Sequence, residues 1–251
     1  MKKELCGTLF TFNCVKHDYC FVQAIQCLLE FCDYVIVCDA GSTDGTVEQL
    51  KLIHGGGRLK LILLDGREWE EQQGREKLNY FTNIAIKEAE DMGFEYQINL
   101  QADEIIHEDS YKAIRKAVYL GREAYMVKRL NLWFTPFRVL HVPNQPCSWQ
   151  IIRLAKTKYR SYGDAESINA QCVLDFVEDI EFWHMGFVRK RSVMKDKIIH
   201  MQRDVFQMGG YDKKLDGGNG FDPSDYFSWD DTEPVKKPLP RLIQQWSFDR
   251  M

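Results

Sequence analysis

Acidic residues follow two of the apolar runs in the first half of the chain. Asp39 ends the run "YVIVCD" and precedes the small residues "AGSTDG", and Asp103 and Glu104 close the stretch "INLQADE". Carboxylate oxygens are the ligands that Mg²⁺ and Mn²⁺ prefer, and these cations commonly share their remaining positions with phosphates and water. A carboxylate can also accept hydrogen bonds from a nucleobase or a ribose. The two clusters therefore indicate either a site for a nucleotide and a divalent cation, or caps of the turns and helices that follow.

Strands and helices alternate in this part of the chain. Apolar residues at helical spacing predict helices over residues 18–31, 45–53 and 75–93, and short apolar runs predict strands over residues 5–12, 34–38, 59–64 and 94–100. Alternation with crossovers this long predicts an α/β fold with a mostly parallel sheet and helices on both faces. In such sheets ligands bind beyond the carboxyl ends of the strands, where Asp39 and Asp103 fall.

The second half of the chain is less regular. We expect a helix over residues 110–120 and strands over residues 124–134 and 150–156, with a proline-broken loop between the two strands. Residues 208–251 show neither a helical nor a strand period. The sequence thus predicts one domain over residues 1–207, followed by an extension that could be a lid over the site or a wrap on the surface.

Composition narrows the class of protein. The formal net charge of -4 gives no overall attraction to nucleic acid or to an anionic membrane. The chain has no apolar run of the roughly 18 residues that a membrane span needs, and its N-terminus is typical of a first strand, not a secretory signal. Six of the 8 cysteines precede residue 39, and none forms a C-x-x-C pair. We therefore expect a cytoplasmic protein without a transmembrane segment, whose cysteines are reduced core residues.

The order and spacing of four motifs over residues 11–104 resemble those of glycosyltransferase family 2, whose members have the GT-A fold. The motifs are "FNCVKHDY" after the first strand, "VIVCDAGSTDGT" in the place of "VVDDGSTDGT", "NIAIKEA", and "LQADE" in the place of the D-x-D loop. The resemblance implies a GT-A-like, Rossmann-type fold, with residues 1–110 as the nucleotide-sugar-binding half and 111–207 as the acceptor half. It also implies transfer of a hexosyl or pentosyl group from a nucleotide-sugar donor, expected to be a UDP-sugar.

The resemblance assigns roles to residues of the first half. Phe12 and Asn13 would lie near the nucleobase, and Asp39 would help to bind uracil or ribose. Gln101 and Ala102 would lie along the donor in the D-x-D loop, and Asp103 would contact the Mn²⁺ or Mg²⁺ ion that bridges the diphosphate. Two positions depart from the family pattern, because Ala40 and Gln101 each replace an aspartate. Metal ligation would therefore depend on Asp103, with Glu104 and a later residue as further candidates.

That later residue is expected in "FWHMGFVRK". His184 is a candidate metal ligand, since neutral imidazole binds Mn²⁺, although a histidine beside a core strand is an equally good interpretation. Arg189 or Lys195 could neutralise the diphosphate leaving group. Solvated positive charge is the alternative for each.

A carboxylate base is expected in "SYGDAESI". In an inverting transfer the base removes the proton of the acceptor hydroxyl while that oxygen attacks the anomeric carbon. Asp164 and Glu166 are the candidates, and a capping pair before a short helix is the alternative.

The acceptor is the least constrained part of the prediction. A saccharide or glycolipid core comes first, and a hydroxymethylated base in DNA second, because the basic stretches 153–160 and 189–197 with Trp133, Phe134 and other aromatics would suit a phosphate-rich acceptor. Two other classes stay open: a non-catalytic relative that binds a nucleotide sugar or glycan, and a sugar nucleotidyltransferase. The latter is disfavoured because "FNCVKHDY" lacks the glycines of a phosphate loop. The sequence does not predict an oligomeric state.

Overall fold

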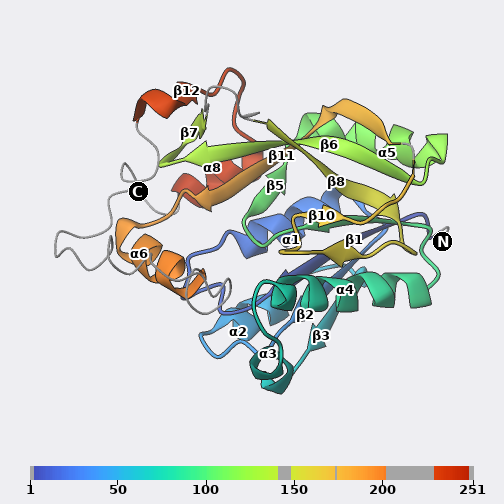
Figure 1. The fold of residues 1–251 in the computed structure, drawn as a ribbon, viewed down its shortest axis with the longest axis horizontal. Coiled ribbons are helices and arrows are strands. Elements are labelled where there is room, and N and C mark those ends of the chain that lie inside the picture. The colour runs from blue at the N-terminus through green and yellow to red at the C-terminus, as the bar shows by residue number, and fades with distance from the viewer. Residues whose placement is uncertain (1–2, 141–147, 173, 202–228, 249–251) are drawn as a thin grey trace.

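The computed structural model describes residues 3–140, 148–172, 174–201 and 229–248 (Figure 1). The helices are α1 (Phe21–Phe31), α2 (Thr46–Lys51), α3 (Arg67–Glu71), α4 (Glu76–Asp91), α5 (Tyr111–Leu120), α6 (Arg191–Ile199) and α8 (Arg241–Phe248). The larger strands are β1 (Leu5–Thr11), β2 (Tyr34–Asp39), β3 (Leu59–Leu63), β4 (Tyr96–Leu100), β6 (Ala124–Trp133), β7 (Thr135–Leu140), β8 (Ser148–Lys156) and β11 (Asp175–Phe187). The short strands are β5 (Glu104–Ile106), β9 (Ser161–Tyr162), β10 (Ser167–Ile168) and β12 (Thr232–Pro234).

A ten-stranded sheet forms the centre of the molecule, in the order β12-β7-β6-β8-β4-β1-β2-β3, with β11 paired to β6 and β5 paired to β11. Strands β4, β1, β2 and β3 are parallel, and β8 joins β4 in the antiparallel sense. The register pairs Thr11 with Asp39 and Leu9 with Leu100, so the segments that follow β1, β2 and β4 leave the sheet at one edge. The predicted α/β class and the parallel first half are confirmed.

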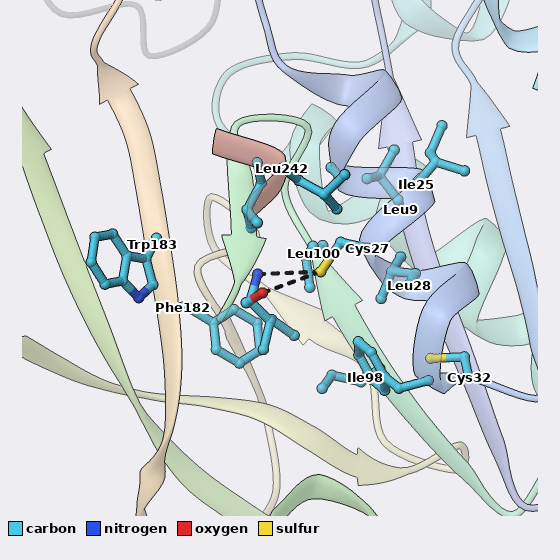
Figure 2. Close-up of a cluster of buried hydrophobic side chains, with 14 of the residues drawn as sticks. Leu9, Ile25, Cys27, Leu28, Cys32, Ile98, Leu100, Phe182, Trp183 and Leu242 are labelled. Carbon is cyan, nitrogen blue, oxygen red and sulfur yellow. Dashed lines mark hydrogen bonds between the residues drawn. The ribbon is translucent and has the colours of Figure 1, made fainter. Parts of the chain in front are cut away.

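Helices cover both faces of the parallel strands because apolar side chains alternate along each strand. On β2, Val35 and Val37 pack with α1, whereas Ile36 and Cys38 pack with α4. Figure 2 shows the α1 side of this core, to which Leu242 of α8 and Phe182 of β11 also contribute. The packing ties elements that are far apart in the sequence to the parallel strands.

The cysteine prediction is also confirmed for the first part of the chain. The six cysteines up to Cys38 are free and buried. Cys27 on α1 lies 3.4 Å from the backbone nitrogen of Ile106 and 3.5 Å from its carbonyl oxygen (Figure 2). A thiol is a weak donor and a weak acceptor. Cys27 therefore links α1 to β5, the strand that directly follows the loop containing Asp103.

Two expectations about irregular structure were wrong. The first part of the predicted loop is strand β7, which forms a hairpin with β6. The segment after residue 208 contributes β12, which extends the sheet beside β7, and α8, which packs on α1. Leu239, Ile243 and Trp246 are buried in the main core. The predicted extension, a possible lid, comprises residues 208–251, and residues 208–228 of it lie outside the described residues. The predicted domain limits stay a prediction.

The loop after β2 is held against the loop after β3. Gly41 has a φ of +92°, and a β-carbon there would lie 2.3 Å from the Cα and N atoms of Gly66. Gly45 has a similar φ of +95° with nothing within 4 Å of its β-carbon position.

Gly41→Ala should therefore destabilise the protein more than Gly45→Ala. Both substitutions carry the strain of a left-handed backbone, about 1–2 kcal/mol. Only Gly41→Ala adds a collision between two backbones, which should cost about 1–3 kcal/mol more. Urea denaturation of the two variants measures the difference, and equal free energies of unfolding would contradict the close approach of the two loops.

Candidate functional site

A cavity of about 250 Å³ opens at the edge of the sheet where β1 and β4 end. It brings together residues from both halves of the chain, as the sequence predicted for a donor site. The predicted site residues that line it are Phe12, Gln101, Ala102, Asp103, Asp164, Glu166 and His184. His17, Trp69, Lys197 and His200 line it as well, and sequence reasoning did not select them.

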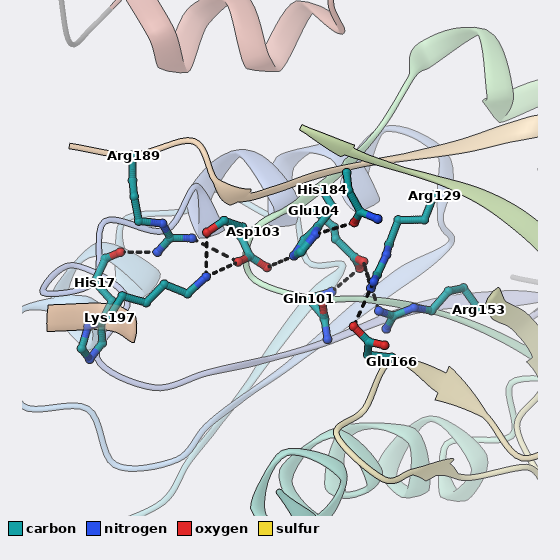
Figure 3. Close-up of polar contacts among 12 residues, drawn as sticks. His17, Gln101, Asp103, Glu104, Arg129, Arg153, Glu166, His184, Arg189 and Lys197 are labelled. Carbon is teal, nitrogen blue, oxygen red and sulfur yellow. Dashed lines mark hydrogen bonds and ion pairs between the residues drawn. The ribbon is translucent and has the colours of Figure 1, made fainter. Parts of the chain in front are cut away.

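Asp103 lies at the centre of a buried group of basic side chains (Figure 3). Its Oδ2 atom is 3.2 Å from Nη2 of Arg189 and 3.4 Å from Nζ of Lys197, and its Oδ1 atom is 3.7 Å from Nε2 of His184. Burial disfavours the charged carboxylate, but the three basic neighbours together hold the pKa of Asp103 well below its usual range. Asp103 is therefore ionised in the folded protein.

His184 reaches Asp103 because β11 pairs with β5. The register sets His184 opposite Glu104, and the backbone nitrogen of Met185 donates a 2.7 Å hydrogen bond to the carbonyl of Asp103. Nδ1 of His184 lies 2.9 Å from Oδ1 of Asn131, which assigns the proton to Nδ1 because the amide oxygen can only accept. A β-carbon on Gly186 would lie 2.6 Å from Nε2 of His184, so the ring needs a glycine at that position.

The pair of Asp103 and His184 has the chemistry of a cation site. Burial lowers the pKa of His184 to about 3, so the imidazole is neutral and its Nε2 lone pair faces the Oδ1 atom of Asp103. The carboxylate oxygen is a ligand for Mg²⁺ or Mn²⁺, and the neutral imidazole nitrogen is a ligand for Mn²⁺. The amide of Asn131 orients the imidazole as an outer-shell partner does in metal sites. Within the described residues no cluster of three or more such ligands occurs, so a cation would need further ligands from substrate or water.

Arg189 and Lys197 supply the positive charge of the site. Arg189 also donates to the carbonyl of His17, and its guanidinium lies 4.5 Å from the ring centre of Tyr19. Lys197 donates a 2.8 Å hydrogen bond to the carbonyl of Gly186. Burial and the charge of Arg189 lower the pKa of Lys197 to about 7. Of the two cations, Lys197 lines the cavity, whereas Arg189 is 1% exposed, lies behind Asp103 and is not among the described lining residues. The side chain of Lys195, the other predicted residue, is outside the described part.

Asp39 and Asn13 hold loops together beside the cavity and are not among the described residues that line it. Asp39 accepts hydrogen bonds from Thr11 and from the backbone and hydroxyl of Ser42. Asn13 has a φ of +47°, its backbone nitrogen donates to Ser42, and its side-chain oxygen accepts from the nitrogen of Thr43. These contacts fasten the loop after β1 to the loop after β2.

An aromatic wall forms the apolar side of the cavity. The rings of Phe12 and Trp69 are stacked, with centroids 3.7 Å apart at 18°, and Trp69 continues onto Phe81 at 5.4 Å. Nζ of Lys77 lies 5.0 Å from the ring centre of Trp69. Trp69 comes from the short helix α3, which the sequence pattern did not reveal.

Asp164 and Glu166 occupy the turn between β9 and β10, which is fixed to α4. The side chain of Asn79 donates to the carbonyl of Gly163 over 3.0 Å. Glu166 accepts a 2.9 Å bond from the buried Arg129 (Figure 3). Burial and the charge of Glu166 raise the pKa of Asp164. Of the two predicted bases, only Glu166 is engaged by Arg129 in an ion pair.

Glu104 was wrongly considered as a further metal ligand. It is fully buried, its Oε1 atom is 3.1 Å from Arg153, and its Oε2 atom accepts from the backbone nitrogen of Gln101. The basic stretch 153–160 also differs from the expected phosphate-binding surface. Arg153 is buried, Arg160 pairs with Glu90, and the lysines at positions 156 and 158 pair with Glu123.

Comparisons with known proteins give structural likeness only. No family model matches the chain, and no curated protein matches its sequence. A crystal structure of S. aureus TarS 1-349 has a TM-score of 0.48 at 13% identity, over 80% of this chain and 66% of TarS 1-349. The same fragment in complex with UDP has a TM-score of 0.49 at 12% identity, over 85% and 77% of the two chains. For S. aureus TarS the values are 0.48 and 15%, over 80% of this chain and 40% of that one.

This chain therefore spans just under two thirds of the length of the first TarS fragment. The overlap is partial, so the function is inferred from the residues of the site. None of the described helices combines the length and apolar character that a bilayer crossing requires.

Removing the charge of Asp103 should destabilise the fold. Asp103→Asn leaves Arg189 and Lys197 buried without a counter-ion, which should lower the free energy of unfolding by about 3–5 kcal/mol. Glu88→Gln removes the partner of Lys60 in a partly exposed pair and should cost at most about 1 kcal/mol. Denaturant titration tests both, and equal losses would show that Asp103 does not organise the site.

Proposed function

We propose that the protein is a glycosyltransferase that moves a sugar from a nucleoside-diphosphate donor to a hydroxyl acceptor. The observation that supports this most is the convergence, in one cavity, of Asp103 with His184, of the cationic Lys197, of the aromatic wall and of Asp164. Each of these groups suits a different part of the donor or of the acceptor. The sequence resemblance over residues 11–104 points to the same activity.

The donor diphosphate would bind at the basic end of the cavity. Arg189 and Lys197 now share the Oδ2 atom of Asp103, and a diphosphate offers stronger, doubly charged acceptors for the same donors. Asp103 and His184 would then hold the Mn²⁺ or Mg²⁺ ion. A bound cation of this kind neutralises the charge that develops on the departing diphosphate. Gln101 offers a neutral amide at the position between the pair of Asp103 and His184 and the carboxylate of Glu166 (Figure 3).

Asp164 would be the general base. Its raised pKa suits proton abstraction better than an ordinary aspartate does. The acceptor hydroxyl would lose its proton to Asp164 while its oxygen forms a bond to the anomeric carbon. The bond between that carbon and the diphosphate oxygen breaks in the same step, which inverts the configuration. Arg129 would act as a positioning residue that keeps Glu166, the other acid of the turn, engaged.

For the donor nucleotide and the acceptor, the proposal follows the sequence-based expectation. We infer a UDP-sugar as donor and a saccharide, a glycolipid core or a hydroxymethylated DNA base as acceptor. The salt-bridged state of the stretch 153–160 favours the saccharide, because it removes one of the two basic surfaces that a DNA acceptor would need. A non-catalytic nucleotide-sugar binder is the alternative that Gln101 leaves open.

A panel of nucleotide sugars tests the proposal. At least one UDP-sugar should raise the melting temperature, and slow release of UDP should follow in the presence of Mn²⁺. Gly186→Ala should reduce the effect of Mn²⁺ about tenfold or more, since a β-carbon at this position displaces the ring of His184. Gly121→Ala, at a remote left-handed glycine with open space around it, is the matched control. Binding without release of UDP would identify a non-catalytic relative, and no binding at all would contradict the proposal.

Asp164→Asn should lower kcat by about a hundredfold or more, because it removes the proton acceptor. In the wild-type protein kcat/KM should fall as the pH decreases through the raised pKa of Asp164, since the protonated acid cannot accept a proton. Glu166→Gln should cost less and should retain this acidic limb. Undiminished transfer by Asp164→Asn would exclude Asp164 as the base.

A further inference from the structure

Asp39, the carboxylate expected to contact the base or the ribose, has its hydrogen-bonding capacity filled by its own loop. Its Oδ1 atom accepts from the backbone nitrogens of Gly41 at 3.1 Å and Ser42 at 2.7 Å. Its Oδ2 atom accepts from the hydroxyls of Thr11 and Ser42, both at 2.7 Å. A carboxylate has about four lone-pair positions, and four donors occupy them here. Asp39 is also fully buried.

The surroundings keep Asp39 in this arrangement. The nitrogen of Asn13 donates a 2.8 Å bond to the hydroxyl of Ser42, so that hydroxyl is fixed from both sides. The contact of Gly41 with Gly66 closes the same loop from the side of α3. A nucleobase could reach the carboxylate only by replacing donors that are already well placed. Such a replacement would leave a buried backbone nitrogen or hydroxyl without a partner, which is unfavourable.

The aromatic wall is available to a base instead. Phe12 is partly exposed and lines the cavity, and Trp69 stacks on it and is itself buried. Trp69 thus fixes the ring plane of Phe12. Stacking of a base on an aromatic side chain tolerates any base, because every base has a π-face.

A buried polar group elsewhere in the cavity lining is equally permissive. The ring of His200 stacks on Trp69, with centroids 6.5 Å apart, and on His17, with centroids 4.9 Å apart. His17 is buried and lines the cavity, and its Nδ1 atom has no hydrogen-bond partner among the described residues. Burial and the nearby positive charges lower its pKa to about 4, so the ring is neutral. A neutral imidazole can place its proton on either nitrogen. It can therefore accept from the N3–H group of uracil or donate to the unprotonated N3 atom of cytosine.

We propose that Asp39 shapes the loop without contacting the nucleobase of the donor, and that the site, with the base on the Phe12–Trp69 pair where the resemblance already sets it, does not select uracil over cytosine. The proposal rests on the proposed function. It predicts that uridine and cytidine diphosphates bind almost equally well. A carboxylate opposite N3 would instead favour uracil, because it accepts from the N3–H group of uracil and meets a lone pair in cytosine.

Isothermal titration of UDP and CDP, with Mn²⁺ present, tests the proposal on the full chain. The two dissociation constants of the wild-type protein should agree within about threefold. Phe12→Leu should weaken both nucleotides by about tenfold or more, the range of a lost base–aromatic stack, and should leave their ratio unchanged. Asp39→Asn should weaken both by the same factor through the loop. If Asp39→Asn fails to fold, Ser42→Ala, a milder change in the same hydrogen-bond network, replaces it in the titration. Melting temperatures show whether each variant folds.

Two results would overturn the proposal. One is a wild-type preference for UDP over CDP of about tenfold or more, and the other is a change in that preference in Asp39→Asn or Ser42→Ala. Either result leaves the proposed glycosyl transfer intact, because a nucleotide still binds. Failure of both nucleotides to bind the folded wild-type protein would instead contradict the proposed function itself, and the stacking site with it.

Discussion

The ionised carboxylate of Asp103 is the interaction on which the arrangement of the site depends. It is buried and would be strongly disfavoured there without compensation. Arg189, from the segment between β11 and α6, and Lys197, from α6, provide that compensation, while the neutral His184 of β11 lies 3.7 Å away on the other side of the carboxylate. Because Arg189 also binds the carbonyl of His17, the same group of charges fixes the loop after β1. One carboxylate therefore sets the relative positions of the two halves of the chain around the cavity.

This arrangement also explains how a site rich in positive charge can exist before a substrate binds. Two buried cations close together repel each other, and the lowered pKa of Lys197 reflects both this repulsion and the loss of hydration. Asp103 balances them in the free protein. A diphosphate would replace Asp103 as the counter-ion of Arg189 and Lys197. An oxygen of Asp103 would then be free to bind a cation. Donor binding and cation binding would thus support each other through a single shared carboxylate.

The sequence was sufficient for the parallel half of the fold and for several of the residues that line the cavity. Alternating apolar runs predicted β1 to β4, and residues at strand ends pointed to Asp103, because the position of a strand end depends on local pattern. The pairing of β11 with β5 could not be foreseen, and only that register carries His184 to Asp103. Lys197 was not predicted for a similar reason, since its contact with Asp103 depends on how α6 packs. Trp69 was missed because α3 spans only 5 residues and has too few turns to show a period.

The role of Asp39 illustrates a different limit. Its place at the end of β2 was predicted correctly, but the direction in which its oxygens point is determined by Thr11 at the end of β1 and by Ser42 in the loop after β2. Sequence pattern gives the location of a polar group more readily than its partners. The strand and the helix at the far end of the chain, β12 and α8, were not predicted because they span only 3 and 8 residues and form by packing against β7 and α1.

The most direct test of the central claim is a crystal structure of the protein with UDP and Mn²⁺, with the anomalous signal of manganese measured. The account predicts a manganese peak bound by Oδ1 of Asp103 and Nε2 of His184, with the diphosphate in contact with Arg189 and Lys197. A manganese ion or a diphosphate bound elsewhere, with the contacts of Asp103 to Arg189 and Lys197 unchanged, would contradict it.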